Sequence, residues 1–195
     1  MDLFSQLSDT VHSAFEVRNL ARDKALMQTR KVIQHAAHAI RAIHRLDVDL
    51  ADGFLNDARL LVDQLRRDLA QHPDLFYAGY TQDALKEYVE ACVTCALIRG
   101  QELPLPEEIE VEPAVYLNGL AEVVGELRRR CLDVMRQGYS PEVERLLSLM
   151  DEIYALLITI DYPDALTNGL RRQTDLARGI VERTRGDVTI SLREQ

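Results

Sequence analysis

The chain has few of the residues that interrupt regular structure. Its 195 residues include only nine glycines and six prolines, too few for the many turns of an all-β fold. No run of 18 or more apolar residues occurs, so the sequence offers no candidate for a membrane-spanning helix. With 47% hydrophobic and 28% charged residues, the composition also excludes wholesale disorder and a collagen-like fibre. We therefore expect a single globular domain over residues 1–195 with a substantial core.

The first residues do not resemble an export signal, and the chain has few cysteines. Residues 1–6 have neither the basic region nor the apolar stretch of a signal peptide, so we expect a cytoplasmic protein. Three cysteines are an odd number, which favours free thiols in a reducing compartment. Cys92 and Cys95 form a C-x-x-C, but no second pair of Cys or His follows at zinc-ribbon spacing. We interpret both as small buried side chains on an apolar helix.

Basic residues are fewer than acidic residues over the whole chain, but one segment is rich in them. Lys and Arg number 23 against 32 Asp and Glu, a net charge of -9, which argues against a protein that coats nucleic acid with its entire surface. Residues 18–45, however, contain seven basic residues and one acid. A local basic face therefore remains possible on an otherwise acidic protein.

Prolines divide the chain into long segments in which apolar residues recur at spacings of three and four. This periodicity predicts helices. Glycine-rich phosphate loops, dinucleotide fingerprints and the Gly-x-Ser-x-Gly nucleophile motif are all absent. We expect an all-α fold of six to seven helices in an antiparallel bundle. The long helices are expected at residues 5–46, 51–71, 81–99, 113–137, 141–160 and 164–185.

The first expected helix carries a cationic face. Its polar side chains fall on two adjacent stripes at helical spacing: Arg30, Gln34, Arg41 and His44 in one, Lys31, His35, His38 and Arg45 in the other. An ordinary solvated face gives the same pattern, but the contrast in sign with the acidic remainder favours a phosphate-binding track. For the histidines, phosphate contact is a simpler role than catalysis. The candidate nucleic-acid-binding residues are Arg30, Lys31, Arg41, His44 and Arg45.

Paired glutamates occur on the third and fourth long helices. Glu87 and Glu90 are three residues apart and Glu122 and Glu126 are four apart, so each pair shares a helix face. Gly119, one turn before Glu122, allows another element to approach closely. If these two helices pack together, four carboxylates converge and form the oxygen-rich ligand set that Mg²⁺ prefers. Glutamate pairs are also common on solvated helices, and spacing alone leaves that interpretation open.

Several short motifs follow one another in a characteristic order. Residues 112–129 contain Tyr-Leu-Asn-Gly at 116–119 and Gly-Glu-Leu at 125–127, followed by basic residues. Shorter motifs are Ala-Ile-His-Arg at 42–45, Leu-Lys-Glu-Tyr-Val-Glu-Ala at 85–91, Gly-Tyr at 138–139, Leu-Arg-Arg at 170–172 and Arg-Gly at 185–186. From about residue 18 to residue 187, the sequence resembles the family of translin and translin-associated factor X.

The acids select a branch of that family. Translin is the nucleic-acid-binding partner and lacks most of the acidic cluster, whereas factor X carries Glu-x-x-Glu on one helix and Asp-x-x-x-Glu on the next as a Mg²⁺-dependent ribonuclease site. The resemblance implies that the catalytic residues and metal ligands are Glu87, Glu90, Glu122 and Glu126. Glu122 stands where factor X has aspartate, and the added methylene leaves Mn²⁺ as an alternative to Mg²⁺.

The resemblance further implies a closed, barrel-like homo-oligomer, expected to be an octamer. Its active sites would face an internal cavity, with basic residues guiding single-stranded RNA, or single-stranded DNA as an alternative. Two functions stay open: a metal-dependent endoribonuclease and a non-catalytic oligomeric binder of single strands. The retained acids favour the first. A helical scaffold for protein partners would leave the cationic face and the paired glutamates unexplained.

Overall fold

The structure is a computed structural model that describes residues 2–193. Within that range the chain contains helices and loops but no strand, which confirms the expected fold class. None of the helices in this range is long and apolar enough to span a membrane. The helices are α1 (Leu3–His44), α2 (Val48–Asp68), α3 (Pro73–Phe76), α4 (Gly79–Ile98), α5 (Pro113–Met135), α6 (Pro141–Leu157), α7 (Asp164–Thr167) and α8 (Leu170–Arg193).

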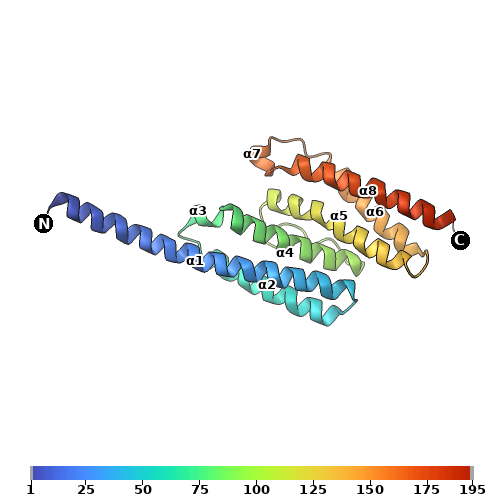
Figure 1. Ribbon diagram of the computed structural model, residues 1–195, viewed down its shortest axis with the longest axis horizontal. Helices are drawn as coiled ribbons and strands as arrows, with labels where there is room; N and C mark the ends of the chain where they lie inside the picture. The colour runs from blue at the N-terminus through green and yellow to red at the C-terminus, as the bar shows by residue number, and fades with distance from the viewer. Residues whose placement is uncertain (1, 194–195) are drawn as a thin grey trace.

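The long helices pack side by side around α4 and α5. Helix α1 packs against α2 and α4, and α5 packs against α4, α6 and α8. Figure 1 shows α2, α1, α4 and α5 one above the other from bottom to top, with α6 and α8 at the upper side. Helix α4 is the most deeply placed element, since twelve of its 20 residues are buried. A charged residue on α4 therefore lies close to the core, where it needs a partner.

Helices α4 and α5 approach each other closely at Gly119. A Cβ atom at this position would lie 2.8 Å from Cβ and Cγ1 of Val89 and 2.9 Å from the backbone oxygen of Lys86. No larger residue fits without movement of one helix, which confirms the close approach expected from the sequence. Because Glu122 follows Gly119 by one turn, the crossing brings it to the face of α4 that carries Glu87 and Glu90.

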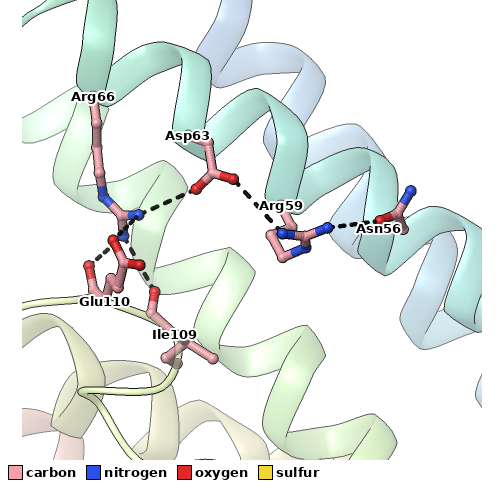
Figure 2. A network of polar contacts seen from close by, with 6 residues as sticks. All are labelled: Asn56, Arg59, Asp63, Arg66, Ile109 and Glu110. Carbon is pink, nitrogen blue, oxygen red and sulfur yellow. Dashed lines mark hydrogen bonds and ion pairs between the residues drawn. The ribbon is translucent and has the colours of Figure 1, made fainter.

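The loop between α4 and α5 is fastened to α2. Arg66 on α2 donates from Nη2 to the backbone oxygens of Ile109, at 3.2 Å, and Glu110, and its Nη1 lies 3.0 Å from the Glu110 carboxylate (Figure 2). Asp63, one turn earlier on α2, holds the same guanidinium at 3.4 Å. These contacts fix the segment that leads into α5, and so help to set the position of the acidic residues on that helix.

The end of the chain departs from the sequence prediction. A continuous helix was expected over residues 164–185, but α7 is a single turn followed by Asn168 and Gly169, both at positive φ (51° and 79°). Asn118 of α5 donates to the backbone oxygen of Thr167 at 2.8 Å and ties this break to the bundle. Helix α8 then continues to Arg193. The single turn α3 was also not expected.

The cysteines are free and lie in or against the core. Cys95 and Cys131 are buried, and Cys92 is half-buried. Burial raises the pKa of both Cys95 and Cys131 to about 11. The interpretation of the C-x-x-C as packing residues is therefore consistent with the structure.

The first half of α1 projects from the bundle (Figure 1). Residues 2–20, here called the arm, are all exposed. Large apolar side chains recur along it at spacings of three and four, with exposed fractions between 42% and 74%: Leu3, Phe4, Leu7, Val11 and Phe15. Helical stability in proteins comes mostly from packing of an apolar face, so the arm has the character of an element that is covered by another molecule.

Candidate metal centre

Three carboxylates meet where α4 crosses α5. Glu87 and Glu90 from α4 and Glu122 from α5 each place one carboxylate oxygen within 4.8 Å of the other two. All three residues are half-buried. The spacing of three on α4 puts its two acids on one face, and the contact at Gly119 brings the third acid to that face. We call these three residues the carboxylate cluster.

Glu90 is strongly affected by its neighbours in the cluster. Burial raises the pKa of its carboxyl to about 8, and the negative charges of Glu122, Glu87 and Glu126 contribute to the increase. At neutral pH the cluster therefore favours a proton on Glu90. A divalent cation bound by these carboxylates would instead favour the ionised form.

Lys86 supplies positive charge to the cluster. Its Nζ lies 2.6 Å from Oε1 of Glu122 and 3.4 Å from Oε1 of Glu87. Burial lowers the pKa of the Lys86 ammonium group, but the hydrogen bond and the charge of Glu122, with a smaller effect of Glu87, raise it above its ordinary value. Gln173 of α8 donates to the same Glu122 oxygen at 3.5 Å. Neither Lys86 nor Gln173 was among the residues predicted for the site.

Glu126 does not belong to the carboxylate cluster. Its Oε2 lies 2.5 Å from Nε2 of His44 and 3.5 Å from Nη1 of Arg129. Burial favours a higher pKa for Glu126, but the hydrogen bond and charge of His44, together with Arg129, lower it. Glu126 is nevertheless near enough to raise the pKa of Glu90. The sequence predicted four converging acids, whereas the structure brings three together and gives the fourth a histidine partner.

His44 is not a surface residue, contrary to the sequence prediction. It was expected on the exposed cationic stripe, but it is 9% exposed and its ring is directed at Glu126. His35 and His38 also turn away from the stripe, because both rings pack against Phe54 of α2 with centroid distances of 5.9 and 4.9 Å. The packing of α1 against its neighbours decides these positions, since helical spacing alone does not show how wide the buried face is.

The other four residues predicted to bind nucleic acid are exposed, three on α1 and Arg45 directly after it. We call Arg30, Lys31, Arg41 and Arg45 the cationic ribbon. The α1 ion pairs in the described part of the chain use other residues: Arg18, Arg22, Lys24, His35 and His44. The ribbon is therefore available to a polyanion. Arg41 and Arg45 are close in sequence to His44, the α1 residue that pairs with Glu126.

The carboxylate cluster fits a hard divalent cation. Mg²⁺ binds oxygen ligands at about 2.1 Å and keeps several waters, so a few carboxylate oxygens separated by about 3–4 Å suffice. The cluster offers oxygen donors within 4.8 Å on flexible glutamate side chains, and small rotations would bring them onto one ion. The all-oxygen character of this group favours Mg²⁺ or Mn²⁺ over softer metals.

A polar recess opens beside the cluster. Lys86 and Asp83 of α4 line it together with amide side chains from four places: Gln82 of α4, Asn118 of α5, Asn168 after α7 and Gln173 of α8. Sequence reasoning did not find these residues, because they come from segments that are far apart along the chain. The recess is therefore polar and contains both an acid and a lysine beside the amide groups.

Comparisons with known proteins agree with the sequence resemblance. No protein-family model matches the chain. The uncharacterized protein MJ0175 of Methanocaldococcus jannaschii is 32% identical over 174 residues, which cover 88% of this chain and 76% of the relative. Apo-NeC3PO has a TM-score of 0.86 at 19% identity, over 98% of this chain and all of that one, and so shares the fold.

Two further solved structures are nearer in sequence. AfC3PO in complex with duplex RNA is 33% identical to this chain, and a second crystal structure of AfC3PO is 32% identical, each with a TM-score of 0.86. Both alignments cover 96% of this chain and 97% of the other. These C3PO structures are of the translin and factor X type. With the same helical fold and this identity over almost its full length, the chain belongs to the translin and translin-associated factor X family.

Proposed function

We propose that the protein is a Mg²⁺-dependent endoribonuclease, with Mn²⁺ as the alternative ion. The observation that carries this proposal is the convergence of Glu87, Glu90 and Glu122 at the crossing of α4 and α5. Three half-buried acids in contact destabilise a protein unless a cation compensates them. A protein that only binds nucleic acid gains nothing from such a group.

The proposed roles follow from the positions of the side chains. Glu87, Glu90 and Glu122 would hold the ion. Glu126 was predicted as a fourth ligand and stays a prediction; in the structure its carboxylate pairs with His44. A bound divalent ion polarises a phosphate and lowers the pKa of a bound water. A carboxylate of the cluster would accept the proton of the attacking water. The cationic ribbon binds neighbouring phosphates of the strand.

RNA is the proposed substrate for two reasons. The cationic ribbon presents four exposed basic residues along one helix, and the relative AfC3PO was solved in complex with duplex RNA. The family resemblance favours cleavage of single strands. Single-stranded and duplex RNA of the same sequence therefore both belong in the assay, with single-stranded DNA as a third substrate.

We also propose that the chain assembles into a closed homo-oligomer, expected to be an octamer. The arm supports this part of the proposal, because its large apolar side chains stay exposed in the described part of one protomer. In a closed assembly the carboxylate clusters would face an internal cavity, which would restrict access to strands that thread inside.

Lys86 is the observation that favours the second candidate function, a non-catalytic oligomeric binder. It already compensates two of the three acids through contacts of 2.6 and 3.4 Å. If the lysine serves as the permanent counter-ion, the protein needs no metal, and the cationic ribbon alone accounts for RNA binding.

Single-turnover cleavage of labelled RNA separates the two functions. Cleavage is expected with Mg²⁺ or Mn²⁺ and not with EDTA, and Glu90→Gln or Glu122→Gln should reduce the rate at least about 100-fold while filter binding of RNA persists. The double change Glu90→Gln with Glu126→Gln should be scarcely slower than either single change, because the groups act as one site. Glu107→Gln, an exposed acid, is the control. Wild-type rates in the cluster variants would leave only the binding function.

A further inference from the structure

Lys86 is a cation that belongs to the chain and contacts the proposed metal ligands. Its Nζ lies 2.6 Å from Glu122 and 3.4 Å from Glu87, on the Oε1 atom of each. These two carboxylates come from different helices, so the ammonium group bridges α4 and α5 through two of the three cluster acids. The side chain is 21% exposed, and water screens its charge only in part.

Two cations that bind the same pair of carboxylates repel each other. A divalent ion held by Glu87 and Glu122 would lie within a few ångströms of the Lys86 ammonium group, where like charges repel strongly. Movement of the lysine away from these oxygens would relieve that repulsion. Lys86 also lines the polar recess beside the cluster, together with Gln82, Asp83 and Gln173, so polar groups surround the space into which its Nζ can turn.

We propose that Lys86 couples metal binding to RNA binding. Lys86 competes with the divalent ion for Glu87 and Glu122, and an RNA phosphate that enters the recess forms an ion pair with Lys86 in place of these carboxylates. The proposal rests on the metal centre proposed above. Lys86 is a positioning residue in this account, because it acts through the carboxylates and the phosphate. The consequence is a site that binds its ion weakly when no strand is present.

Thermodynamic linkage makes the coupling measurable from either side. If RNA removes Lys86 from the carboxylates, RNA must raise the affinity for the metal, and the metal must raise the affinity for RNA by the same factor. Removal of the lysine charge should raise the affinity for the metal in the absence of RNA and reduce the coupling factor. A merely structural lysine would have neither effect.

The test is calorimetric titration with Mn²⁺, with electron paramagnetic resonance as a second measure of bound ion. The titrations use wild type, Lys86→Met and Lys86→Arg, each alone and with a 2′-O-methyl single-stranded oligonucleotide that retains its phosphates. Lys24→Met is the matched control, since Lys24 forms a 2.8 Å ion pair with Asp68 away from the cluster. Thermal melting verifies folding, and Lys86→Gln replaces Lys86→Met if the methionine variant does not fold.

Lys86→Met alone is expected to bind Mn²⁺ about tenfold more tightly than wild type, because a like charge is removed at close range. Lys86→Arg and Lys24→Met should stay near wild type. The oligonucleotide should raise the affinity of wild type several-fold and that of Lys86→Met much less. Equal or weaker Mn²⁺ binding by Lys86→Met would overturn the role of Lys86 while the metal centre stands. If neither wild type nor Lys86→Met binds Mn²⁺, the proposed metal centre is wrong as well.

Discussion

At the residue scale, the site holds more negative charge than the neighbouring basic side chains compensate. Glu87, Glu90 and Glu122 bring three acids into contact, and Lys86 is the one basic side chain within 4 Å of cluster oxygens among the described ion pairs. Glu126 relieves part of the repulsion by pairing with His44. The remaining imbalance falls on Glu90, where it adds to the effect of burial in raising the pKa.

The Glu90 carboxyl gives the metal-free protein a specific dependence on pH. Its pKa is about 8 in the folded protein and 4.5 ordinarily. Between these values the unfolded chain releases the proton while the folded protein retains it, so the contribution of Glu90 to stability falls as pH rises through this range. In EDTA, the unfolding temperature of wild type should therefore drop more between pH 5 and about 8 than that of Glu90→Gln. Thermal melts at several pH values measure this difference, and parallel curves would contradict it.

Added Mg²⁺ provides the complementary measurement. Binding to the folded state alone raises stability, so wild type at pH near 8 should melt at a higher temperature with Mg²⁺ than with EDTA. Glu90→Gln should gain less, because an amide is a weak ligand for this ion.

The cationic ribbon gives a prediction about salt dependence. Arg30→Ala with Arg41→Ala should weaken binding of single strands equally across base sequences, because phosphates carry no sequence information. The plot of log affinity against log salt should flatten by roughly 0.7 for each phosphate that the variant no longer neutralises. The matched control is Arg178→Ala with Arg183→Ala, two exposed arginines of α8. Unchanged affinity in the ribbon variant would show that the cationic ribbon is an ordinary solvated surface.

At the scale of elements, the proposed chemistry depends on one helix crossing. Helix α4 supplies two acids and α5 supplies the third, so the distance between the helices decides whether the carboxylates meet. Gly119 sets that distance through its close approach to Val89 and the backbone of Lys86. Arg66 fastens the α4–α5 loop to α2 a few residues before α5 begins (Figure 2).

Gly119→Ala should therefore damage both stability and the site. The new methyl group would lie 2.8–2.9 Å from Val89 and from the backbone oxygen of Lys86, and relief of this overlap by helix movement should cost about 1–3 kcal/mol. The same movement separates Glu122 from the α4 acids and should weaken Mn²⁺ binding. Denaturant unfolding and calorimetry measure the two effects.

Gly125→Ala is the control for that substitution. It lies on the same helix, and an added Cβ meets nothing within 4 Å. Alanine is the better helix former by roughly 0.5–1 kcal/mol, so this variant should be at least as stable as wild type and bind Mn²⁺ normally. Equal losses in both variants would show that the crossing at Gly119 has no special importance.

At the scale of the whole molecule, the most conspicuous feature is the arm. Its apolar stripe extends from Leu3 to Phe15 and projects beyond the bundle (Figure 1). In a monomer this surface would remain in water, which monomeric proteins seldom tolerate. The proposed closed oligomer would give the stripe a place to pack and would enclose the carboxylate cluster.

Wild type should therefore have a mass several times 22.2 kDa in multi-angle light scattering at micromolar concentration. Phe4→Gln with Phe15→Gln should lower that mass, because the substitutions remove two exposed aromatic anchors from the arm. The helical content of the bundle should not change, since no residue of the arm is buried within the described protomer. If wild type is a monomer, the proposed closed oligomer and its internal cavity are wrong.

The sequence by itself determined which residues share a helix face. Apolar spacing and the prolines indicated the long helices, and spacings of three and four paired the glutamates. Gly119 marked the close crossing because glycine is the one residue without a Cβ. These properties are local, since the geometry of one helix fixes them.

Only the tertiary structure decided which faces meet and how deeply each side chain is buried. His44 is 9% exposed and pairs with Glu126, although its spacing placed it on the cationic stripe. Lys86 reaches Glu122, 36 residues further along the chain, and Asn168 ends α7 at a left-handed backbone position. Such contacts arise from the packing of segments distant in sequence, and helical periodicity carries no information about the partner that a face will find.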